Sequence, residues 1–200
     1  MTDQKTPTVR RAQTGVGRAA PHLPGDGHMW FMVLGDLVIF GGYFVAYMVF
    51  RAKAPVEFLA DQQHLNITLG VVNTIVLITS SWLVVEGVHA ARAGNRAGAV
   101  GLVRGGMVCG VLFAVIKVYE WTAEIQAGYT NSSTFFSFYY VLTGVHLFHV
   151  ALGLIILGVV VRDLRNPRRA RVGMVEQGAT YWHMVDLLWV VIFALLYVMR

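Results

Sequence analysis

Five long apolar segments, separated by short polar connectors, dominate the sequence. They cover residues 29–50, 66–91, 103–126, 135–161 and 179–199. Each segment is apolar on all sides and long enough to cross the hydrocarbon core of a bilayer, which takes about 20 helical residues. Because a helix satisfies its own backbone hydrogen bonds in lipid, the pattern predicts an all-α fold, an integral membrane bundle of five transmembrane helices.

The composition agrees with this pattern and excludes several classes of protein. Charged residues make up only 14% of the chain, where a soluble domain carries about 25%. Together with a hydrophobic content of 56% and a single cysteine, Cys109, this excludes a disordered chain, a nucleic-acid-binding protein and a disulfide scaffold. The polar residues 1–27 are expected to form a flexible basic cytoplasmic arm, and residues 28–200 the membrane domain.

The basic residues predict the orientation of the bundle. Twelve of the 16 Lys and Arg residues fall in the N-terminal arm, in the connector around residues 92–104 and in the connector 162–171, whereas three fall on the opposite side. Cytoplasmic connectors carry the excess of Lys and Arg in membrane proteins. The N-terminus is therefore expected in the cytoplasm and the C-terminus outside, which an odd number of spans also requires.

Several ionisable side chains lie inside the predicted spans, where a charge is costly and usually faces the bundle interior. They are Asp36 in the first span, Glu86 and His89 in the second, Lys117 and Glu120 in the third, His146 and His149 in the fourth, and His183 and Asp186 in the fifth. At 1.5 Å per residue, Asp36 lies about 10–12 Å from the cytoplasmic edge. His149, His183 and Asp186 fall in the same inner half, so these four residues are expected to form one buried polar layer.

Each candidate has a structural and a functional interpretation. Lys117 and Glu120 share one helix face and are interpreted as a neutralised structural pair. Asp36 is either a proton-relay group or a carboxyl that pins helix packing. His146 or His149 together with His183 could hold a haem between two helices, but hydrogen bonding of each imidazole to a neighbouring helix is the preferred interpretation. No catalytic, cofactor or metal site is predicted in this chain.

Five sequence blocks nevertheless resemble, in order, those of one family. LTGVHLFHVALG (142–153) resembles the T-G-x-H-x-x-H-V-x-x-G signature of haem–copper oxidase subunit III, and YWHMVDLLW (181–189) resembles its last-helix motif. The other three blocks are LGDLVIFGGYFVAY (34–47), VVNTIVLITSS with GNRAG (71–98), and IKVYEW (116–121). Asp36 stands where the family usually has a buried glutamate.

The resemblance implies a non-catalytic accessory subunit in its five-helix form. Such a subunit packs on subunit I, and is also expected to contact subunit II, in an oxidase of the prokaryotic plasma membrane. It supports proton uptake and binds phospholipid. Haem and copper are expected in those partner subunits and not in this chain. The resemblance places Glu120, Lys117 and His146 in motif-matched structural or interface positions.

Three alternatives stay open at this stage. The segment PGDGHMWFMVLGD (24–36) also resembles subunit III-like proteins associated with nitric oxide reductases, so the substrate of the complex is either oxygen or nitric oxide. A stand-alone bis-histidine haem cytochrome is the second alternative. A small proton-coupled carrier centred on Asp36 is the third.

Overall fold

The computed structural model describes residues 27–130, 133–166 and 172–199, and this part of the chain is helical throughout except for short turns. Its elements are α1 (Gly27–Lys53), α2 (Pro55–Gln62), α3 (Ile67–Arg92), α4 (Arg96–Gln126), α5 (Thr134–Arg165), α6 (Val172–Phe193) and the π-helical turn η1 (Ala194–Val198). Five helices, α1, α3, α4, α5 and α6 with η1, are long and apolar enough to cross a membrane. The prediction of an all-α bundle with five spans is confirmed. The predicted arm, residues 1–27, lies outside the described residues except for Gly27.

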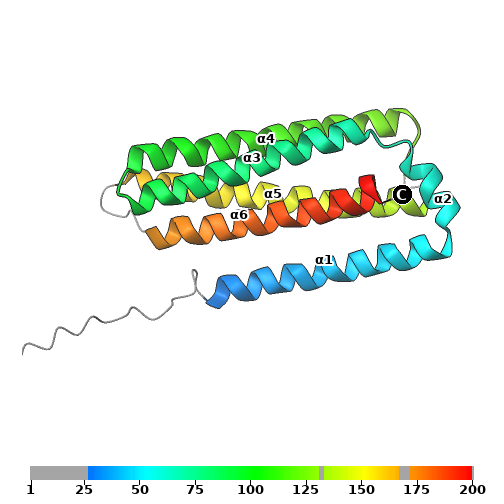
Figure 1. The fold of residues 1–200 in the computed structure, drawn as a ribbon, viewed down its shortest axis with the longest axis horizontal. Coiled ribbons are helices and arrows are strands. Elements are labelled where there is room, and N and C mark those ends of the chain that lie inside the picture. The colour runs from blue at the N-terminus through cyan, green and yellow to red at the C-terminus, as the bar shows by residue number, and fades with distance from the viewer. Residues whose placement is uncertain (1–26, 131–132, 167–171, 200) are drawn as a thin grey trace, which may run out of the picture.

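The long helices lie side by side along the long axis of the molecule (Figure 1). Helix α6 is the central one, since 61% of the residues in its apolar stretch are buried in the bundle. Helix α1 lies at the periphery, since only 17% of the residues in its apolar stretch are buried. The first residues of α1 and the last residues of η1 lie at opposite ends of the bundle, as five spans require.

Helices α4 and α5 begin before the predicted spans, because capping groups set their first residues. Helix α4 begins at Arg96, since the side chain of Asn95 accepts a hydrogen bond from the backbone N–H of Gly98 at 3.0 Å. Helix α5 begins after Ser133, which caps the N–H of Phe136 in the same way. The last turn of α5 reaches Arg165, well past the apolar segment. Apolar length therefore locates the lipid-embedded part of a helix, while the caps locate its ends.

One element was not predicted. Residues 51–65 were interpreted as a polar connector, but they contain α2, with Pro55 in its first turn. Phe58 of this short helix is buried and meets the rings of Tyr47 and Phe135 edge-on at 5.6 and 5.8 Å. Helix α2 therefore closes one end of the bundle, beside the start of α5.

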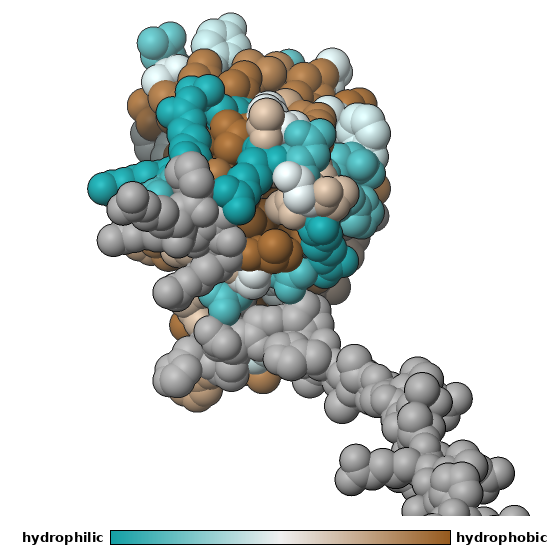
Figure 2. Space-filling model, turned by 90° about the vertical axis from the view of Figure 1, so that its left-hand side faces the viewer, coloured by the Kyte–Doolittle hydropathy of each residue, from teal (hydrophilic) through white to brown (hydrophobic). Residues whose placement is uncertain are grey.

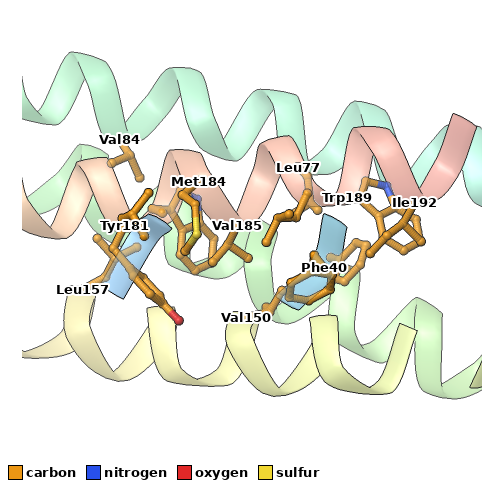
Figure 3. Packing of buried hydrophobic residues seen from close by; sticks show 14 of the residues in the cluster. Phe40, Leu77, Val84, Val150, Leu157, Tyr181, Met184, Val185, Trp189 and Ile192 are labelled. Carbon is orange, nitrogen blue, oxygen red and sulfur yellow. The ribbon is translucent and has the colours of Figure 1, made fainter. Parts of the chain in front are cut away.

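Buried side chains from α6 fill the centre of the bundle. Figure 3 shows Tyr181, Met184, Val185 and Trp189 in one layer with Leu77 of α3, above the α5 ribbon. Trp182 is also fully buried, and its indole N–H donates to Ser80 Oγ at 3.0 Å. Such interlocking cores tolerate little change in volume.

Two glycines make room for Trp182. A Cβ atom added to Gly110 of α4 would lie 2.6 Å from the Trp182 ring, and one added to Gly153 of α5 would lie 2.7 Å from it. These distances are far below van der Waals contact. Close approach of α4 and α5 to α6 thus depends on the absence of a side chain at both positions.

We expect Gly110→Ala to destabilise the bundle by about 1–3 kcal/mol, because the added methyl group overpacks the Trp182 site. Gly101→Ala on the same helix is the matched control, since a Cβ there meets nothing within 4 Å. The measurement is the denaturant midpoint of the purified protein in mild detergent. Equal midpoints for the two variants would contradict this packing argument.

Candidate functional site

A fully buried ion pair lies on α4. Lys117 Nζ lies 3.0 Å from Glu120 Oε2, one helical turn away, and the side chains are 0% and 1% exposed. The ammonium also donates to Tyr139 of α5 at 3.2 Å and to Tyr197 of η1 at 2.6 Å. The pair proposed from the sequence is present, and two tyrosines complete it.

This network satisfies the hydrogen-bonding capacity of its cation. An ammonium has three N–H donors, and Lys117 uses them on Glu120, Tyr139 and Tyr197. The Tyr197 hydroxyl donates in turn to Glu120 Oε1 at 2.5 Å. Because its residues come from α4, α5 and η1, the network links three segments of the chain at one depth.

A second pair joins α1 to α5. His149 Nε2 lies 3.4 Å from Asp36 Oδ1, and the ring of Phe40 packs on the imidazole with 5.4 Å between centroids. The other ring nitrogen, Nδ1, lies 2.7 Å from the backbone carbonyl of Val145. A carbonyl oxygen can only accept, so Nδ1 carries a hydrogen and donates to it.

His183 and Asp186 lie on a different side of the bundle, against α3. The Ser81 hydroxyl lies 2.6 Å from His183 Nδ1. Asp186 is 7% exposed, and neither of its carboxylate oxygens has a hydrogen-bond partner among the residues that the structure describes. All three residues line one pocket between α3 and α6.

His146 is buried among aromatic rings. Its imidazole lies 5.6 Å from the Phe113 ring of α4 and 5.3 Å from the Trp189 ring of α6, measured between centroids. Neither ring nitrogen has a hydrogen-bond partner within the described segments. The position of His146 is therefore defined by packing.

The four residues of the expected polar layer form two separate groups. Asp36 and His149 meet between α1 and α5, whereas His183 and Asp186 line the α3–α6 pocket. The three histidines considered for haem contact different neighbouring helices: His146 packs on α4 and α6, His149 meets α1, and His183 meets α3. In the described part of the chain, no cluster of three or more His, Cys, Asp or Glu side chains could hold a metal ion.

Sequence reasoning missed the partners of these groups. Tyr139 lies in a run of aromatic residues that looks like an interfacial belt, but it is fully buried. Tyr197 stands in an apolar run and Ser81 ends a run of three hydroxyl residues, and neither context signals the contact that the side chain makes. Only a prediction of how the helices are rotated about their axes would have brought these hydroxyls toward the charged side chains.

Comparison with known proteins gives one consistent result. The sequence profile of the family described as cytochrome c oxidase subunit III matches residues 26–200. Cytochrome c oxidase subunit 3 of Synechocystis sp. is 34% identical over 90% of this chain and 77% of its own length. The protein of the same name from Thermostichus vulcanus is 32% identical over 86% of this chain and 89% of its own length.

A longer relative covers the same region. The heme-copper oxidase subunit I+III of Aeropyrum pernix is 27% identical over 84% of this chain, which corresponds to 22% of that protein.

Proposed function

The chain belongs to the cytochrome c oxidase subunit III family, and from this premise we propose that it is the non-catalytic subunit III of a respiratory haem–copper oxidase. In this role it packs on subunit I, stabilises it and supports proton uptake into it. The match to the family over residues 26–200 is the observation that carries the proposal. Haem, copper and the electron transfer to oxygen then belong to the partner subunits.

The polar interior of the bundle supports an accessory role. Lys117 is neutralised by Glu120 inside the chain, and Asp36 lies in contact with His149. Such internally compensated groups stabilise a bundle at membrane depth, where an isolated charge would be costly. The Asp36–His149 pair, which joins α1 to α5, is the residue pair that we assign to the proton-related role.

The partner is argued from the relatives. The Aeropyrum pernix protein carries the name subunit I+III, so subunits of these two types occur in one chain there. A separate subunit III such as this chain is therefore expected to bind subunit I through its membrane surface. The exposed apolar side chains of α1, for example Phe31, Val38 and Val45, are available to membrane lipids or to partner helices.

The charge distribution supports the expected orientation. Figure 2 looks onto the end of the bundle where α3 ends and α4 begins, and hydrophilic side chains gather there. Arg92, Arg96 and Arg165 belong to this end, whereas Arg51 and Lys53 lie at the other. Under the positive-inside rule this end faces the cytoplasm, and the bacterial relatives favour a plasma membrane.

A pull-down tests the proposal. The tagged chain is purified in mild detergent from its native membrane, and the eluate is analysed by absorption spectroscopy and mass spectrometry. We expect haem to arrive together with a large multispan subunit whose purified complex reduces oxygen. A partner that reduces nitric oxide would replace the oxidase assignment by the reductase alternative, and a colourless solitary chain would refute both.

A further inference from the structure

The groove between α3 and α6 contains a carboxylate that the described chain leaves unpaired. The pocket has a volume of about 390 Å³, and its lining includes Ser81, Trp82, His183, Asp186 and Leu187. Asp186 is more than nine-tenths buried, and neither of its oxygens accepts a hydrogen bond from a described residue. The Ser81 hydroxyl in the same pocket lies 2.6 Å from His183 Nδ1, and the tautomer of His183 decides which of the two donates.

The carboxylate lies near the middle of the membrane, deeper than the inner half expected from the sequence, because the last span begins at Val172 and not near residue 179. The last span runs from Val172 to Val198, so Asp186 is 14 residues from its first residue and 12 from its last. At 1.5 Å per residue, this is about 18–21 Å from either end of the helix. The hydrocarbon core is about 30 Å thick, so a lipid headgroup lies about 15 Å from this depth.

This depth excludes the ordinary occupants of a membrane groove. An acyl chain reaches Asp186 but has no hydrogen-bond donor, and a headgroup has donors but does not reach it. A polar group left without a partner in hydrocarbon is costly. The groove therefore requires an occupant that presents a donor at the midplane, and a transmembrane helix of another subunit can do so.

The rims of the groove have the character of a helix-docking surface. Trp82 on α3 is 62% exposed and Leu187 on α6 is 57% exposed, and Ile78 and Val190 beside them are also exposed. They surround the acid with apolar area. A buried polar contact ringed by aromatic and aliphatic side chains is the usual arrangement of residues that dominate binding energy.

We propose that the α3–α6 groove is the docking site for a transmembrane helix of subunit I, and that a hydrogen-bond-donating or cationic side chain of that helix pairs with Asp186. This inference rests on the proposed function, because it takes subunit I as the partner. It adds the face of the bundle and the contact that determine the pairing. The contact would also make the groove selective for its partner helix, because a helix without a hydrogen-bond donor at that depth would leave Asp186 unpaired.

Photo-crosslinking in the native complex tests the docking face. A photoreactive amino acid replaces Trp82 or Leu187 on the rims, and Val111, at similar depth on the α4 surface and 51% exposed, is the matched control. We expect crosslinks to subunit I from both rim positions and none from the control. Crosslinks to subunit I from position 111 alone, or from the rims only to a second copy of this chain, would overturn the proposal.

A substitution tests the carboxylate itself. Asp186→Leu is expected to lower the amount of subunit I retained after a stringent detergent wash by about tenfold, since it leaves the partner's donor unpaired. Asp186→Asn, which can still accept a hydrogen bond, should lose less. Equal chain levels and equal elution volumes of the isolated variants show that folding is intact. Unchanged retention in Asp186→Leu would overturn the proposed contact.

The two proposals fail in different ways. If no haem-containing partner accompanies the unmodified chain, the proposed function fails. If the partner accompanies it but crosslinks only from the α4 surface, the proposed function stands and the docking face is wrong.

Discussion

Lys117→Met is expected to produce the largest loss of stability, about 3–5 kcal/mol, because it leaves the charge of Glu120 buried without its cation. Glu120 is 1% exposed and would retain only the hydroxyl of Tyr197 as a partner. The substituted side chain fills similar space, so the effect reports on the charge and not on a cavity. The measurement is the free energy of unfolding in detergent, obtained from a denaturant titration.

The double variant Lys117→Met with Glu120→Gln is the control for this prediction. It removes both charges together and should be clearly more stable than Lys117→Met alone, since an apolar or neutral replacement of a buried pair costs little. Additive losses for the two single substitutions would show that the residues do not act as a pair.

Asp36→Leu is expected to have the second largest effect, a loss of about 2–3 kcal/mol from the α1–α5 contact. His149 would keep its bond to the Val145 carbonyl but lose its partner at Nε2. We expect lower recovery of the assembled oxidase and inactivation after severalfold fewer turnovers. The haem content of each subunit I that is recovered should stay unchanged.

Asp36→Glu separates the chemistry from the packing at this position. It retains a carboxyl group and has the residue that subunit III sequences usually carry, so it should preserve both recovery and catalytic lifetime. Wild-type recovery and lifetime in Asp36→Leu would exclude a role for the carboxyl.

The number and kind of membrane spans could be predicted from the sequence because lipid imposes a simple requirement. A backbone that crosses hydrocarbon must satisfy its own hydrogen bonds, so a long apolar run can only be a helix. Helix α2 escaped prediction because it is only eight residues long, too short to cross a membrane, and it is stabilised by Phe58 packing on distant rings. Nothing in its local pattern distinguishes it from a connector.

The sequence identified which polar side chains are buried in the bundle, but not which of them contact one another. Lys117 and Glu120 pair within one helix, so their spacing was sufficient evidence. The predicted layer of four residues required knowledge of how α1, α5 and α6 are rotated, which hydropathy does not contain because these helices are apolar on all sides. In the structure, α6 turns Asp186 toward α3, while Asp36 meets α5.

The buried cluster around Lys117 has a consequence for biosynthesis. Glu120 neutralises the ammonium from within the same helix, whereas Tyr139 and Tyr197 belong to segments that are synthesised later. Helix α4 can therefore leave the translocation machinery with the charge of Lys117 already compensated by Glu120. The hydroxyl groups of Tyr139 and Tyr197 join the ammonium only when the later spans have been inserted. Because the neutralising carboxylate precedes the two tyrosines along the chain, α4 does not have to enter the membrane with the charge of Lys117 uncompensated.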